Sequence, residues 1–165
     1  MTKKLHQLIV SLDTMTLVWA IRKKGPSDKV THARYLFQHL EKDNAQIVIP
    51  SVVIAEYVVP LKNRKEREEV IARMGDRFLI APFDAKDAAL AAQLWSEGRK
   101  EREMQKKGAR VLLKADALII ATAFGHGARI FYTDDDDCLR MATTVMEAKK
   151  LPTMPPDLLG YVREE

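Results

Sequence analysis

One stretch decides the fold expected of this chain: Arg129-Ile130-Phe131-Tyr132-Thr133-Asp134-Asp135-Asp136-Asp137. Its first part is apolar and strand-like, and a run of four aspartates follows directly. In open parallel sheets, ligands bind outside the carboxyl ends of the strands, where the loops converge. The stretch therefore predicts a strand over residues 129–133 with carboxylates gathered at its carboxyl end.

Three more carboxylates, Asp13, Glu56 and Asp116, each lie inside an otherwise apolar segment. Carboxylates in such surroundings are costly unless something compensates them. A hard divalent cation, which takes oxygen ligands from carboxylates and usually keeps several waters, would make them tolerable together. The pattern indicates a metal-dependent enzyme. The alternative is that Asp13 and Asp84 cap helices, Glu56 lies on the surface and the acidic run is a loop. For each residue taken singly, this alternative explains the sequence as well as a metal site does, but it does not explain all of the residues together.

Strand-like and helical runs alternate along the chain, as expected of a parallel sheet flanked by helices. Strands are predicted over residues 6–12, 46–49, 77–81 and 129–133. Helices are predicted over residues 14–22, 28–40, from Pro50-Ser51 onward, over 64–73, from a cap at Asp84 towards Lys107, and over 111–124. The predicted fold class is α/β, with a central, mainly parallel sheet in a three-layer α/β/α arrangement. Residues 1–165 are expected to form a single domain, since this length buries a sufficient core.

Composition excludes some classes of protein and favours others. No apolar run approaches the roughly 20 residues that a membrane span requires, and Met1-Thr2-Lys3-Lys4 is not expected to begin a signal peptide. The single cysteine, Cys138, leaves no internal disulfide and fits a cytoplasmic location. The formal charge of +4, beside such acidic sites, suggests a basic exterior that gathers a polyanion around a cation-loaded centre.

Four blocks of the sequence, in this order, resemble the signature blocks of PIN-domain nucleases, and the closest resemblance is to the VapC-like ribonuclease toxins of type II toxin–antitoxin systems. The resemblance covers nearly the whole chain. The departures are Cys138 where the family commonly has phenylalanine, and a long interval between Asp13 and Glu56; both concern the subgroup rather than the chemistry. The blocks are Leu8-Ile9-Val10-Ser11-Leu12-Asp13-Thr14, Ile49-Pro50-Ser51-Val52-Val53-Ile54-Ala55-Glu56, Ala115-Asp116-Ala117-Leu118-Ile119-Ile120-Ala121-Thr122-Ala123 and Tyr132-Thr133-Asp134-Asp135-Asp136-Asp137.

The resemblance implies a set of site residues and a reaction. Its catalytic and metal-binding acids correspond to Asp13, Glu56, Asp116 and, by the Thr-x-Asp pattern, Asp135. Asp137 matches a further acidic position that supports the metal site, with Thr14 and Thr133 as supporting residues. The implied cofactor is Mg²⁺ or Mn²⁺, and the implied reaction is hydrolysis of single-stranded RNA to leave a 5'-phosphate and a 3'-hydroxyl. RNA contacts are not assigned, and the choice of ligand within the run of residues 134–137 stays open.

Partners and alternatives follow from the same resemblance. The implied partners are an RNA substrate and a small antitoxin protein, and a homodimer is expected. A housekeeping RNA-processing enzyme and a PIN-like module that only binds RNA remain as alternatives. A receiver-type phosphoacceptor domain would need paired acids after the first strand, a central aspartate and a late lysine, none of which is found. The histidines lack zinc-like spacing, so they are interpreted as surface or capping groups; they are His6, His32, His39 and His126.

Overall fold

The computed structural model describes residues 7–105 and 110–155, and a five-stranded parallel sheet forms the centre of this part of the chain. Its strands lie in the order β3-β2-β1-β4-β5. The chain thus starts in the middle of the sheet, builds one edge through β2 and β3, and returns past β1 to build the other. The strands are β1 (Ile9–Leu12), β2 (Gln46–Pro50), β3 (Leu79–Ala81), β4 (Ile130–Tyr132) and β5 (Glu147–Lys149).

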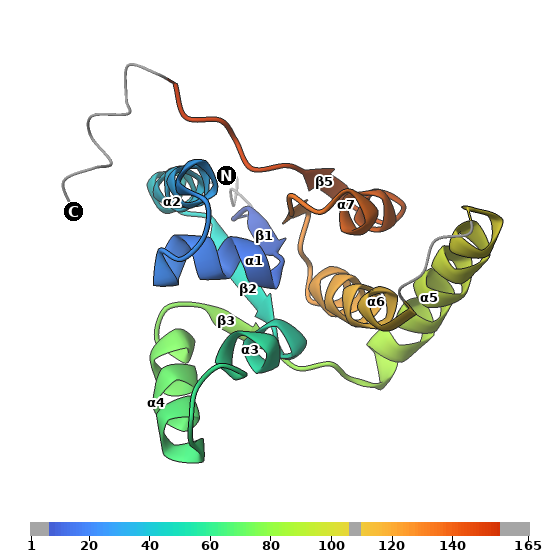
Figure 1. The fold of residues 1–165 in the computed structure, drawn as a ribbon, viewed down its shortest axis with the longest axis horizontal. Coiled ribbons are helices and arrows are strands. Elements are labelled where there is room, and N and C mark those ends of the chain that lie inside the picture. The colour runs from blue at the N-terminus through green and yellow to red at the C-terminus, as the bar shows by residue number, and fades with distance from the viewer. Residues whose placement is uncertain (1–6, 106–109, 156–165) are drawn as a thin grey trace, which may run out of the picture.

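Helices cover both faces of the sheet, so the predicted α/β class and three-layer arrangement are confirmed (Figure 1). One layer contains α1 (Thr14–Leu17), the π-helical turn η1 (Val18–Arg22), α2 (Ser27–Lys42), α3 (Ser51–Val58) and α4 (Arg64–Gly75). The other contains α5 (Ala85–Gln105), α6 (Arg110–Gly125) and α7 (Asp136–Thr143). Across the described ranges, none of these helices has both the length and the apolar character needed to cross a membrane.

The strand order places a topological switch point between β1 and β4. These two strands pair with each other in register, with Leu12 opposite Tyr132. The connection that leaves β1 leads towards β2, whereas the connection that leaves β4 leads towards β5. Because the two connections diverge, a crevice is expected between them at the carboxyl ends of the strands, where ligands bind in open α/β sheets.

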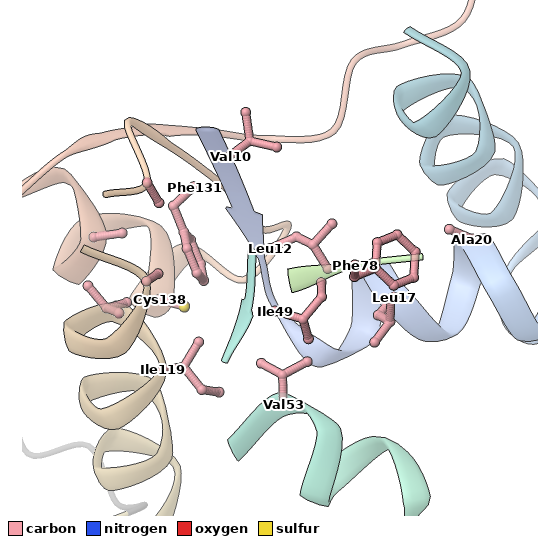
Figure 2. Packing of buried hydrophobic residues seen from close by; sticks show 14 of the residues in the cluster. Val10, Leu12, Leu17, Ala20, Ile49, Val53, Phe78, Ile119, Phe131 and Cys138 are labelled. Carbon is pink, nitrogen blue, oxygen red and sulfur yellow. The ribbon is translucent and has the colours of Figure 1, made fainter. Parts of the chain in front are cut away.

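The ends of β1 and β4 are anchored by a core on both faces of the sheet. Figure 2 shows Leu12 and Ile49 packed with helix residues such as Val53, while Phe131 lies towards Ile119 on the other face. These side chains are buried, and burying one of this size stabilises the fold by roughly 1.5–3 kcal/mol. The strands therefore read as nearly continuous apolar runs, as sheets covered on both faces require.

Most predicted elements are confirmed within a few residues, but the sequence analysis did not find α7 or β5. The edge strand β5 consists of Glu147, Ala148 and Lys149, and its two charged residues are exposed, so the apolar alternation that identifies strands is missing. No helix was predicted at the acidic run, whereas Asp136 and Asp137 form the first turn of α7.

The third strand begins at Leu79 rather than at residue 77. The helix predicted over residues 14–22 is confirmed, and the π-helical turn η1 forms its second part. The predicted start of the first strand at His6 and the predicted end of the long helix at Lys107 lie outside the described residues.

Candidate functional site

Asp13 occupies the point where β1 ends and α1 begins. Its backbone N–H donates to the carbonyl oxygen of Tyr132 (3.1 Å), which continues the pairing of β1 with β4 by one residue. Its carboxylate caps α1, since Oδ1 accepts from the backbone N–H of Thr16 (2.8 Å). The other oxygen, Oδ2, accepts from the hydroxyl of Thr133 (2.5 Å). Both oxygens are thus fixed in direction at the switch point.

The surroundings of Asp13 disfavour its charged form. The residue as a whole is only half-buried, but its carboxyl group is enclosed by protein, and this burial raises its pKa above the ordinary value of 3.8. Hydrogen bonds from Thr133 and Thr16 act in the opposite direction without cancelling the effect, and the charge of Asp134 adds to the rise. A cation beside the group would favour the carboxylate instead.

Thr133 and Asp135 extend the connection from β4. Thr133 is fully buried, and its hydroxyl both donates to Asp13 and accepts from the backbone N–H of Asp135 (3.1 Å). Asp135 caps α7, where its Oδ1 accepts from the N–H of Cys138 (2.8 Å). A single buried hydroxyl therefore joins two of the predicted acids, Asp13 and Asp135, from opposite sides of the switch point.

The other aspartates of the run are each paired with a basic side chain. Asp134 binds Lys29 (Nζ to Oδ2, 2.6 Å) and accepts from the backbone N–H of Leu151 (3.1 Å). Asp136 is exposed and pairs with Lys150 (2.6 Å). Asp137 pairs with the Arg140 side chain one turn later in α7. The run is therefore not a uniform acidic patch, because its members point to different partners.

Glu56 reaches the same edge of the sheet from α3. Its Oε2 accepts a short hydrogen bond from the hydroxyl of Thr14, the residue that follows Asp13. Glu56 is exposed and Thr14 is half-buried, so the pair faces solvent at the mouth of the crevice. This contact places the second predicted block beside the first although 42 residues separate them.

Asp116 is half-buried on α6, and its charge acts on the buried thiol of Cys138. Burial raises the pKa of the Cys138 thiol far above its usual range, and the charges of Asp116, Asp13 and Asp135 raise it further. Three of the four predicted acids therefore lie near enough to one buried thiol on α7 to raise its pKa. Because the thiol is held neutral, it is not a reactive nucleophile.

A cavity of about 240 Å³ adjoins Asp116. Besides apolar and small residues, it is lined by the acids Glu97, Glu101 and Asp137 and by Arg140, which lies 3.8 Å from Glu101. The sequence analysis assigned no role to Arg140 or to Lys29. Asp137 and Arg140 have the helical i,i+3 spacing, so their pairing is predictable from the sequence. Lys29 lies 105 residues from Asp134, and no local pattern connects the two.

The structure thus brings the predicted acids to one edge without drawing them into a tight cluster. A tighter group is found in another place: Asp84, Asp87 and His126 offer ligand atoms that all lie within 4.8 Å of one another. It is the only such group of three or more among the described residues. The interpretation of His126 as a simple surface or capping residue was therefore incomplete.

The PIN domain family model matches residues 10–143 of the sequence. The chain belongs to the PIN domain family. The four acids at the carboxyl edge lie within the matched range, and the resemblance stated from the sequence blocks is confirmed. The strand order agrees with this result and not with a receiver-type domain, because flavodoxin-like receivers have the order 2-1-3-4-5.

Solved structures with a similar fold include chains of VapBC complexes. A chain of VapBC2 from Rickettsia felis, bound to a DNA fragment from their promoter, has a TM-score of 0.55 and 23% identity, over 88% of this chain and 100% of that one. A chain of DNA-bound VapBC from Salmonella typhimurium has a TM-score of 0.57 and 18% identity, over 88% and 100%. A chain of FitAcB from Neisseria gonorrhoeae has a TM-score of 0.51 and 21% identity, over 86% and 96%. No curated protein matches the chain.

The raised pKa of Asp13 makes a prediction about stability in the absence of divalent cations. The folded PIN domain binds the Asp13 proton more tightly than the unfolded chain does. The stabilisation that protonated Asp13 contributes is therefore complete below about pH 4, the ordinary pKa of the group. It is lost as the pH rises through the pKa of the folded state. We expect Asp13→Asn, which cannot ionise and still caps α1, to melt above the wild type at pH 7 in EDTA, with a difference that shrinks towards pH 4.

Asp136→Asn is the matched control, because the Lys150 ammonium lowers the pKa of Asp136 and that residue favours stability when charged. It should not melt above the wild type at pH 7. Thermal melts of the three proteins across this pH range measure the effect. Asp13→Asn melting below the wild type at pH 7 would contradict the electrostatic account of the site.

Proposed function

We propose that this PIN domain is a divalent-metal-dependent endoribonuclease that hydrolyses single-stranded RNA and acts as the toxin of a toxin–antitoxin pair. The observation that carries the proposal is the hydrogen-bonded connection from Asp13 through Thr133 to Asp135 across the β1–β4 switch point. Membership of the PIN family supports nuclease chemistry. The arrangement of the acids supports a metal centre as the basis of that chemistry.

The donor set fits a hard cation. Asp13, Glu56, Asp116 and Asp135 supply carboxylate oxygens, the ligands that Mg²⁺ and Mn²⁺ take in proteins. The enclosed Asp13 carboxyl, with its raised pKa, is the group whose charged form gains most from a cation. When bound, the ion supplies a water of lowered pKa and holds negative charge on the phosphate oxygens during hydrolysis.

The protein's own contribution is to hold these oxygens in place. Thr133 fixes Asp13 and the backbone of Asp135 together, and Thr14 orients Glu56. We assign both threonines a positioning role, since a hydroxyl between acids restricts their rotation without adding charge. We assign Asp137 a supporting role, because Arg140 already neutralises it and it lies with Asp116 on the wall of the adjoining cavity.

The choice of a metal ligand among residues 134–137 follows from the partners that each aspartate already has. Asp134 is bound to Lys29 and to the Leu151 backbone, and Asp136 pairs with Lys150 away from the enclosed acids. Asp135 uses Oδ1 to cap α7. Its charge, like those of Asp13 and Asp116, raises the pKa of the Cys138 thiol. We therefore propose Asp135 as the ligand from this run.

The toxin assignment rests on the VapC-like resemblance and on the likeness to chains of VapBC complexes. A small antitoxin that places an arginine in the crevice would pair with its carboxylates, since a guanidinium binds two carboxylate oxygens at once. A cytoplasmic location, a homodimer and a single domain over residues 1–165 remain parts of the prediction. The products remain a 5'-phosphate and a 3'-hydroxyl, as the resemblance implies.

We expect Asp135→Asn to lower RNA cleavage by about 100-fold or more, because changes even to residues behind metal ligands cost 10–100-fold. Asparagine caps helices as well as aspartate does, so the variant should fold. Asp136→Asn, one residue away, is the control and should cleave like the wild type. EDTA should stop cleavage, and Mg²⁺ or Mn²⁺ should restore it. Wild-type rates for a well-folded Asp135→Asn, or full activity in EDTA, would refute the metal-centre assignment.

A cellular experiment separates a toxin from a processing enzyme. We expect expression of the wild-type chain to arrest growth and degrade RNA, because no antitoxin neutralises it, while Asp116→Asn is tolerated at equal protein levels. Co-expression of a cognate small antitoxin should restore growth. Growth curves and RNA integrity provide the measurement. Equal growth of the two strains with intact RNA would reject the toxin role and favour a narrower processing nuclease.

A further inference from the structure

We propose that Asp84, Asp87 and His126 form a second cation site, for a transition-metal ion of the zinc class, that clamps the start of α5 to the end of α6. The three side chains offer ligand atoms within 4.8 Å of one another. They come from the start of α5 and the end of α6, two helices that pack side by side (Figure 1). The site shares no residue with the proposed nuclease centre and does not depend on that function.

Helix capping explains part of this group. Asp84 Oδ1 accepts from the backbone N–H groups of Lys86 (3.0 Å) and Asp87 (3.3 Å), which confirms the cap predicted from the sequence. Asp87 Oδ2 accepts in return from the N–H of Asp84 (3.2 Å). This reciprocal pattern is a capping box, which satisfies the first N–H groups of α5. It accounts for one oxygen of each aspartate and for neither Asp87 Oδ1 nor the histidine.

The remaining oxygen of Asp87 is buried without a partner. Asp87 is 2% exposed, and its Oδ1 makes no hydrogen bond within the described part of the chain. A buried acceptor without a hydrogen bond costs free energy, and capping of α5 does not need this second oxygen. Space for the carboxylate is made by Gly125 at the end of α6, since a Cβ there would clash with Oδ1. Asp87 thus keeps one buried oxygen without a partner, beside the end of α6 that His126 follows.

His126 supplies the third ligand atom. Its Nε2 lies 3.8 Å from Asp87 Oδ2 and 3.0 Å from the carbonyl oxygen of Pro82. Because a carbonyl can only accept, Nε2 carries a proton that it donates to Pro82. A metal ion would replace that proton, and the Pro82 oxygen is placed to become a fourth ligand. The histidine side chain is 20% exposed, so the ion can enter from solvent.

The mixed ligand set selects the class of ion. Imidazole with carboxylates suits zinc and related transition metals, whereas Mg²⁺ prefers oxygen ligands alone. Zinc bonds of about 2.0–2.2 Å would draw the three ligand atoms closer together than they are now. Asp84 can move to do so, because its competing contact with Lys86 (3.4 Å) is an exposed pair of little strength. The carbonyl end of α6 also favours a cation at this position.

Zinc binding is tested on the full chain carrying Asp13→Asn and Asp116→Asn, which disables the proposed nuclease centre. After removal of metal with EDTA, zinc is titrated by calorimetry, and bound metal and melting temperature are measured. We expect one zinc per chain and a rise in melting temperature. Adding His126→Gln should remove both, while adding His39→Gln, which changes an exposed histidine on α2, should remove neither. No zinc in the parent, or equal zinc in the two histidine variants, would overturn the proposal.

Asp84→Asn in the same parent provides a second variant. Asparagine preserves the helix cap but is a poorer metal ligand, so the fold is kept while zinc affinity should fall at least tenfold. An unchanged affinity would overturn the proposal. Because zinc is counted without any RNA, failure of this site and failure of the nuclease assignment are distinguishable.

Discussion

The enclosed carboxyl group of Asp13 is the constraint on which the rest of the carboxyl edge depends. The backbone that carries it is fixed by pairing with β4, through the hydrogen bond from Asp13 to Tyr132. Its two oxygens are held by α1 on one side and by Thr133 on the other. Burial raises its pKa, so a bound cation would compensate the charge of this group. In the proposed metal centre, some stability is given up where a charged ligand is needed.

The strand order explains why acids from distant parts of the chain meet there. β1 and β4 are neighbours, but their connections diverge, and the acids that follow them face one another across the gap. Glu56 is brought in by α3 through Thr14, and Asp116 by α6, whose position is fixed by packing of Ile119 and its neighbours. The same topology separates the chain from receiver-type domains, which gather aspartates around a different strand order.

Much of this arrangement could be predicted from the sequence, because apolar runs locate buried strands and acids at their ends locate the candidate site. The pairing of Lys29 with Asp134 could not, since contacts between residues distant in sequence leave no local pattern. The strand β5 was missed because an edge strand tolerates charged residues on its exposed side. The group of Asp84, Asp87 and His126 was missed because its members come from two helices without a ligand spacing typical of zinc sites.

The central claim is that Asp13, Glu56, Asp116 and Asp135 together hold a divalent cation. The most direct measurement is the anomalous signal of manganese in crystals of the wild-type protein grown with Mn²⁺. The account predicts manganese at the β1–β4 switch point, with oxygens of Asp13, Glu56, Asp116 and Asp135 as ligands. Crystals saturated with Mn²⁺ in which these acids bind no metal would contradict it, even if the ion were found beside Asp84, Asp87 and His126.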